Sequence, residues 1–67
     1  MFIFLNDEII IEANEIAYVE KVGYCYGDIV LKNGKEIRFV GKGKTELAKE
    51  ENFQSMWNTI VENLKNI

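Results

Sequence analysis

The chain has 67 residues, 11 acidic and 8 basic side chains, a net charge of −3 and a hydrophobic fraction of 48%. This length leaves room for a single domain, residues 1–67, with one small core, and it excludes Rossmann folds and closed enzyme barrels. The chain has no histidine, and Cys25 is its single cysteine. The commonest general base, an intrachain disulfide and a structural zinc site are therefore excluded as well.

Short apolar and β-branched runs predict five strands, at about 2–5, 8–12, 16–22, 28–32 and 35–40. Asn6 and Asp7 separate the first two runs, and we expect a hairpin across these turn-forming residues. Asn33 and Gly34 tolerate positive φ, which predicts a type I′ turn between the last two strands. The sequence thus predicts an antiparallel succession of hairpins.

The middle of the predicted sheet is less regular. In the third strand, Ile16 and Tyr18 are expected on one face, and the residues between and after them on the other. Segment 23–27 encloses two tyrosines and Cys25 between glycines. It is either a loop or a bulged continuation of the strand, and both readings remain open at this point.

Apolar residues recur at helical spacing near the end of the chain and predict an amphipathic helix at about 52–65. Thr45 can cap a short turn over residues 45–50, and Asn52 is a second candidate cap. Acidic residues interrupt the apolar pattern between these two segments. The predicted fold class is α+β, an antiparallel β-meander of four to five strands with one C-terminal amphipathic helix packed on one face.

One helix can cover one face of such a sheet, but the runs at 2–5 and 9–11 place apolar side chains on both faces. A second copy of the chain is the simplest cover for the other face, so a homodimer is our first expectation. Curling of the sheet into a partly closed barrel would bury both faces without a partner. The strand at 2–5 pairs either within the chain or between chains.

The residues offer little for catalysis. A chain without histidine has no Ser–His or Cys–His arrangement, and we predict a protein that is not an enzyme and uses no cofactor or metal. Gly43–Thr45 resembles the end of a phosphate-binding loop, but Arg38 stands where that motif needs glycine. Cys25 has Lys21 as its only nearby base, so we expect a packed rather than a reactive thiol.

Charge is distributed unevenly along the chain. Residues 1–31 carry six acids and one base, whereas residues 32–49 carry six bases and two acids. We interpret the basic stretch as a contact for nucleic acid or an acidic protein, with tyrosines that can stack on bases. The alternatives are a solvated hairpin whose lysines prevent aggregation, or an acidic half that is itself the contact surface. The candidate partner-binding residues are Tyr24, Tyr26, Lys32, Lys35, Arg38, Lys42 and Lys44.

Several segments are similar to a known bacterial family. Those that resemble the first two-thirds of LytTR-type DNA-binding domains are Asn14–Glu20, Ile29–Lys35, Thr45–Leu47, Phe53 and Asn63–Ile67. The resemblance implies a β-rich regulator that contacts DNA through loop residues. The family's His-Arg-Ser segment is replaced here by 56–59, and the basic residues of its last strands have no counterpart. The resemblance therefore assigns no DNA-contacting residue in this chain.

These observations favour a small non-enzymatic binding or regulatory protein that docks on a macromolecular partner. The abundance of Ile, Asn, Lys and Glu is typical of AT-rich bacterial or phage genes and suggests an inhibitor of host (anti-defence) machinery. The alternatives are a nucleic-acid-binding module that uses residues 32–44 and a structural homo-oligomer subunit. A lone cysteine and the lack of a long apolar run indicate a cytoplasmic protein that does not bind membranes.

Overall fold

The computed structural model describes residues 1–66, and its strands form two antiparallel sheets, of order β1–β2 and β3–β4–β5. The elements in chain order are β1 (Phe2–Leu5), β2 (Ile9–Glu12), the 3-10 turn η1 (Ala13–Glu15), β3 (Ile16–Lys21), β4 (Tyr26–Leu31), β5 (Glu36–Val40) and α1 (Glu46–Lys65). The α+β class is confirmed, with five strands followed by one helix. The meander is interrupted at η1, which separates the two sheets.

β1 and β2 form the predicted hairpin, with Ile3 opposite Ile11 and Leu5 opposite Ile9. The turn places Asn6 and Asp7 at φ values of 50° and 59°. Asn and Asp tolerate this left-handed region better than most residues because their short polar side chains can bond locally. The N–H that follows them donates to the Leu5 carbonyl at 3.1 Å and closes the turn. The first strand therefore pairs within the chain.

The alternation predicted for the third strand is wrong. The pairing of β3 with β4 shifts register between Ile16 and Tyr18. An extra residue at such a bulge reverses the face of everything that follows it. As a result Ile16 is buried and Tyr18 is exposed, although the two residues are only two positions apart. Of the two readings for segment 23–27, each holds for a part. Residues 23–25 form a short loop, and Tyr26 and Gly27 are the first residues of β4.

The type I′ turn predicted at Asn33 and Gly34 is also wrong. The Gly34 N–H donates to the Leu31 carbonyl at 2.9 Å, so the two central residues of the turn are Lys32 and Asn33. In this turn Gly34 has positive φ, at 93°, and Asn33 does not. Gly34 thus occupies the left-handed position that follows the Lys32–Asn33 turn, and residues 32–34 form a three-residue hairpin loop.

The helix begins at Glu46 rather than near residue 52, so the predicted range of 52–65 is too short. Thr45 is the cap that the sequence predicts, and its Oγ1 accepts a hydrogen bond from the Ala48 N–H at 3.1 Å. Asn52 lies inside the helix and is not a cap. Leu47, in the first turn, is 63% exposed. Because this end of α1 is solvated, it lacks the apolar pattern from which helices are predicted.

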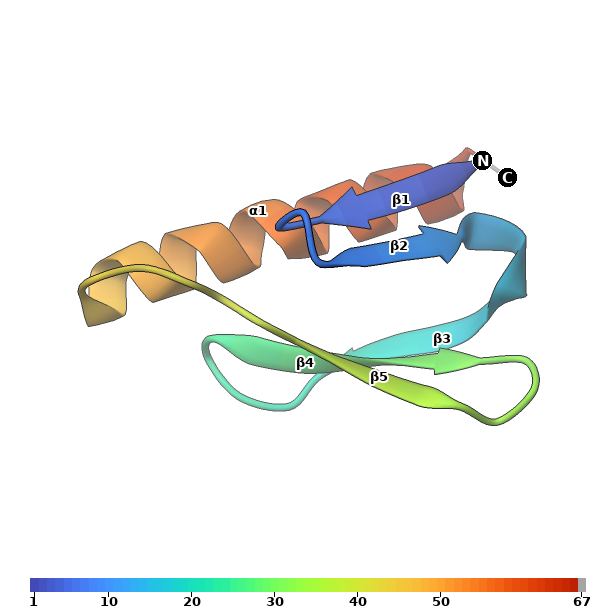
Figure 1. Cartoon of the computed structure of the whole chain (residues 1–67), viewed down its shortest axis with the longest axis horizontal. Helices are drawn as coiled ribbons and strands as arrows, with labels where there is room; N and C mark the ends of the chain where they lie inside the picture. Colours follow the sequence, from blue (N-terminus) through green and yellow to red (C-terminus); the bar gives the residue numbers. More distant parts are fainter. Residues whose placement is uncertain (67) are drawn as a thin grey trace.

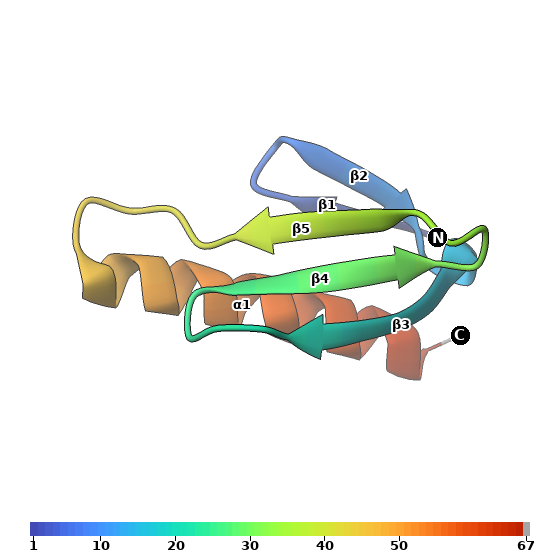
Figure 2. The same cartoon turned by 90° about the horizontal axis from the view of Figure 1, so that it is seen from below.

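α1 lies against the inner faces of both sheets (Figures 1 and 2). Phe39 of β5 and Phe53 of α1 stack at the centre of the core with a centroid distance of 5.4 Å. The buried apolar residues are Ile3, Leu5, Ile11, Ala13, Ile16, Ile29, Phe39, Phe53, Met56 and Ile60. Each strand, the η1 turn and the helix contribute to this single core, so one helix covers the inner faces of two small sheets.

Asn52 links the first sheet to the rest of the chain. Its amide exchanges two hydrogen bonds with the Asn6 amide, at 2.8 and 3.0 Å. The same Asn52 oxygen accepts a third hydrogen bond from the Lys42 N–H at 2.8 Å. One partly buried side chain therefore joins the β1–β2 turn, the connection after β5 and the helix.

Candidate docking surface

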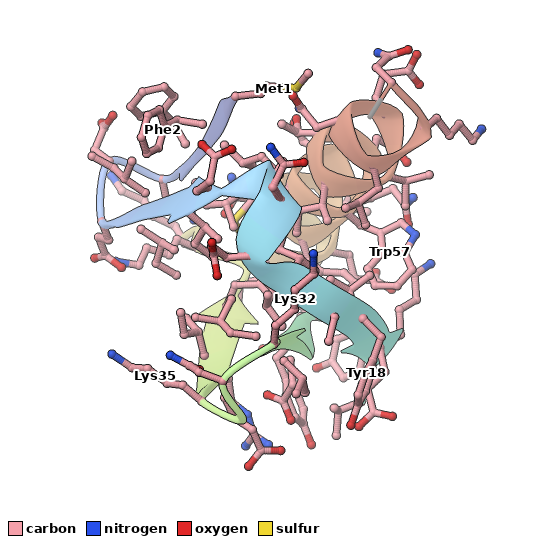
Figure 3. The ribbon with its side chains drawn as sticks, turned by 90° about the vertical axis from the view of Figure 1, so that its right-hand side faces the viewer. Met1, Phe2, Tyr18, Lys32, Lys35 and Trp57 are labelled. Carbon is pink, nitrogen blue, oxygen red and sulfur yellow. The ribbon has the colours of Figure 1, made fainter. Side chains whose placement is uncertain are left out.

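The structure does not bring the predicted partner-binding residues together in one surface. Lys32 and Lys35 lie at the β4–β5 turn (Figure 3), whereas Lys42 and Lys44 follow β5 at its other end. At the rise of an extended strand, the chain from Lys35 to Lys42 spans roughly 20 Å. The basic stretch is therefore divided between two ends of the molecule.

Arg38 and Tyr26 form a closed group with Asp28 on the outer face of the three-stranded sheet. Arg38 donates from Nε and Nη2 to the two Asp28 oxygens at 2.9 and 3.2 Å. Its guanidinium lies 4.9 Å from the centroid of the Tyr26 ring. The hydrogen bond lowers the pKa of Asp28 and raises the pKa of Arg38. The cation of Arg38 is thus neutralised within the chain.

Two more of the predicted residues have partners inside the molecule. Lys42 forms an ion pair with Glu8, and the Tyr24 hydroxyl donates to the Glu46 carboxylate. The hydrogen bond to Glu46 raises the pKa of Tyr24 to about 12 and lowers the pKa of Glu46. Among the ion pairs of residues 1–66, the predicted cations without one are Lys32, Lys35 and Lys44.

The outer face of the β1–β2 hairpin exposes three large apolar side chains. Phe2, Phe4 and Ile10 are 60%, 65% and 63% exposed, and we call them the outer apolar patch. Phe4 and Ile10 are direct cross-strand neighbours. Ile3 and Leu5, which alternate with the two phenylalanines, are 1% exposed and face the core. Figure 3 shows Phe2 projecting away from the body of the molecule.

The partner-binding set predicted from the sequence omitted this patch. The signal was available, because residues 2–5 are four consecutive apolar residues in a strand with only one covered face. Successive side chains of a strand point to opposite faces, so half of such a run must be exposed in a two-layer fold. The expectation that apolar side chains occupy both faces is confirmed. That expectation concerned the faces of the sheet, and the predicted binding residues did not include Phe2, Phe4 or Ile10.

Carboxylates border the outer apolar patch, and two of them are paired within the chain. Glu8 pairs with Lys42, and Glu12 accepts from the N-terminal ammonium of Met1 at 3.1 Å. The hydrogen bond from that ammonium lowers the pKa of Glu12. The border is therefore much closer to neutral than the acidic first half of the sequence suggests.

A cavity of about 190 Å³ lies between the β1–β2 turn and β5, above Met56 of the helix. Binding pockets for metabolites and cofactors usually measure about 300–1,000 Å³, so this cavity is small for such a ligand. Residues 1–66 contain no group of three or more His, Cys, Asp and Glu placed to hold a metal ion.

The glycines of the Gly41–Thr45 segment have a packing role. A Cβ atom at Gly41 would lie 2.0 Å from the Lys49 carbonyl oxygen, and one at Gly43 would lie 2.5 Å from the Ala48 Cβ. The segment therefore needs glycine to run close to the first turns of α1. Cys25 is a half-buried free thiol packed against the core, as the sequence predicts.

Comparisons with models of protein families, with curated proteins and with solved structures each found no significant match. The resemblance to LytTR-type domains therefore stays a prediction. No helix in the part of the chain that the structure describes is long and apolar enough to cross a membrane.

Proposed function

We propose that this chain is a small non-enzymatic binding protein that docks on a protein partner through the outer apolar patch. The observation that supports the proposal is the exposure of Phe2, Phe4 and Ile10 on one face of one hairpin. Large apolar side chains grouped on the surface of a small protein mark interaction sites, because their exposure to water is unfavourable. A neutralised border leaves this apolar group as the main chemical feature of the face.

A protein partner is favoured over nucleic acid by the placement of the cations. Affinity for nucleic acid depends on several cations that reach phosphates together. Here Arg38 and Lys42 are paired with carboxylates, and the other predicted cations, Lys32, Lys35 and Lys44, are divided between the two ends of β5. We propose a regulatory role in which the docked chain occupies a surface of its partner. The setting in a phage or mobile element, as an inhibitor of host machinery, rests on size and composition alone.

Site-specific photo-crosslinking tests the docking surface. A photoreactive phenylalanine analogue is placed at Phe4 in one variant and at Leu47 in another, since these side chains are 65% and 63% exposed. Both are irradiated in a bacterial lysate. We expect protein adducts at position 4 that are absent at position 47. Equal adducts at both positions, or none at position 4, would contradict the proposal.

Direct nucleic-acid binding is the alternative to exclude. We expect labelled single- and double-stranded oligonucleotides to show no change in anisotropy with the chain at low salt. The matched variant is the double charge reversal K32E/K35E at the β4–β5 turn. Oligonucleotide binding that disappears at high salt and in this variant would contradict the proposal and identify the β4–β5 turn as a nucleic-acid site.

A further inference from the structure

We infer that the surface on which the outer apolar patch docks is a second copy of this chain, in a two-fold dimer with the β1–β2 hairpins packed face to face. This inference rests on the proposed function and names the partner of the same site. In a two-fold contact the same patch serves both copies, so each apolar group meets its counterpart or a neighbour of its counterpart. Phe4 and its cross-strand neighbour Ile10 stand between Phe2 and the turn, which places them nearest the axis.

The area of the face is enough for a small dimer contact. The three residues of the patch are 60–65% exposed. A large apolar side chain presents about 150–250 Å² when free, so these three residues expose roughly 350 Å² per copy. Apolar atoms supply about 65% of a homodimer interface, which implies roughly 550 Å² per copy and roughly 1,100 Å² in total. That total exceeds the roughly 1,000 Å² that a specific interface needs.

The charges at the border also suit a second copy. A two-fold contact brings the same border against itself, so unpaired carboxylates there would repel one another. Glu8 and Glu12 each have a cation of their own chain, Lys42 and the Met1 ammonium. Asp7 has no ion pair among residues 1–66, and it lies in the turn at the end of the hairpin. The contact therefore avoids repulsion near the axis.

Other surfaces are less suited to this contact. The outer face of the three-stranded sheet has the Asp28–Arg38 pair in its central row. Two copies joined there would have to desolvate both charges twice. On the helix, Leu47 is exposed between acidic and basic neighbours and forms no group with other apolar residues of the first turn. The β1–β2 hairpin is the surface whose central row, Phe4 and Ile10, is apolar, and its ion pairs lie at the border of the patch.

Sedimentation equilibrium of the full chain tests the dimer. The chain and three variants, Phe4→Asp, Ile10→Asp and Leu47→Asp, are measured from about 1 μM to about 1 mM. We expect the unmodified chain and Leu47→Asp to dimerise with the same dissociation constant. We expect Phe4→Asp and Ile10→Asp to weaken dimerisation at least about 100-fold, because a charge is buried at the centre of the contact. Circular dichroism melting verifies that each variant is folded.

The outcomes separate the two claims. A chain that stays monomeric at the highest concentration overturns the second copy as partner. In that case the docking surface still stands if crosslinking at position 4 captures a different protein. Dimerisation that is unchanged by both Phe4→Asp and Ile10→Asp overturns the inference and places the interface elsewhere. An equal loss in Leu47→Asp overturns it too, since the effect would then not depend on the patch.

Discussion

The two sheets of this protein share one helix on their inner faces but differ on their outer faces. The three-stranded sheet places Asp28, Arg38 and the Tyr26 ring together, so the central charges of its outer face are paired within the chain. The β1–β2 hairpin instead presents Phe2, Phe4 and Ile10, with charges only at the border. This difference is why we propose the hairpin, rather than the three-stranded sheet, as the contact surface.

The largest effect is expected within a single strand of the hairpin. Ile3 and Phe4 are consecutive but 1% and 65% exposed. We expect Ile3→Ala to lower the free energy of unfolding by about 2–5 kcal/mol, because it leaves a cavity in the core. Phe4→Ala should lower it by no more than about 1 kcal/mol. Urea unfolding at low protein concentration measures both, and similar losses would contradict the assignment of the two faces.

The link between the sheets is expected to have the next largest effect. Asn52→Ala removes three hydrogen bonds at a partly buried site and should lower the free energy of unfolding by about 1–3 kcal/mol. Asn58→Ala, on the exposed side of the same helix, is the control and should change it by less than about 0.5 kcal/mol. Hydrogen exchange should show greater loss of protection in β1–β2 than in β3–β5. A uniform loss would mean that Asn52 does not join the sheets specifically.

A smaller effect concerns the Asp28–Arg38 pair on the outer face of the three-stranded sheet, whose contribution to stability depends on pH. The hydrogen bond from Arg38 lowers the pKa of Asp28 from its ordinary value of 3.8. The unfolded chain then takes up this proton at a higher pH than the folded chain. The stabilisation is thus present above about pH 4 and is lost as the pH falls through the lowered value. Asp28→Asn should flatten the decline of the urea midpoint in this range, and an unchanged decline would show that other carboxylates cause it.

The smallest effect is local to the β3–β4 loop. The hydrogen bond to Glu46 raises the pKa of Tyr24 to about 12. Glu46→Gln should return it toward its ordinary value of 10.0, and ultraviolet absorbance of the tyrosinate measures the change. In the unmodified chain, stability should fall as the pH rises from about 10 to about 12, because only the unfolded chain releases this proton there. Identical titrations of the two proteins would show that the hydrogen bond is not formed in solution.

Local patterns in the sequence predicted the strands and the Thr45 cap, because these depend on neighbouring residues. The start of the helix was missed because its first turns are solvated and show no apolar stripe. The face of Tyr18 was missed because a bulge in the pairing with β4, rather than the sequence of β3, determines it. The predicted partner-binding residues were scattered because closeness in sequence placed Lys35 and Lys42 together, whereas a strand holds them apart.

The sequence also could not show that Asn52 bonds Asn6. The two residues are 46 positions apart, and each by itself is typical of a turn or a helix cap. The outer apolar patch was only half predicted for a similar reason. Its residues were recognised as apolar, but the face that the helix leaves uncovered depends on how the two sheets are arranged.

The contact between β1 and α1 also has a consequence for how the chain is made. β1 precedes the other described elements in the chain, and the helix that covers its inner face follows all five strands. Until that helix emerges, the nascent hairpin has apolar side chains exposed on both faces, which favours aggregation. The β3–β4–β5 meander has neighbouring strands and can pair early. Packing of α1 on the hairpin, with the Asn52–Asn6 hydrogen bonds, is therefore expected to follow the pairing of β3, β4 and β5 and to protect the hairpin from aggregation.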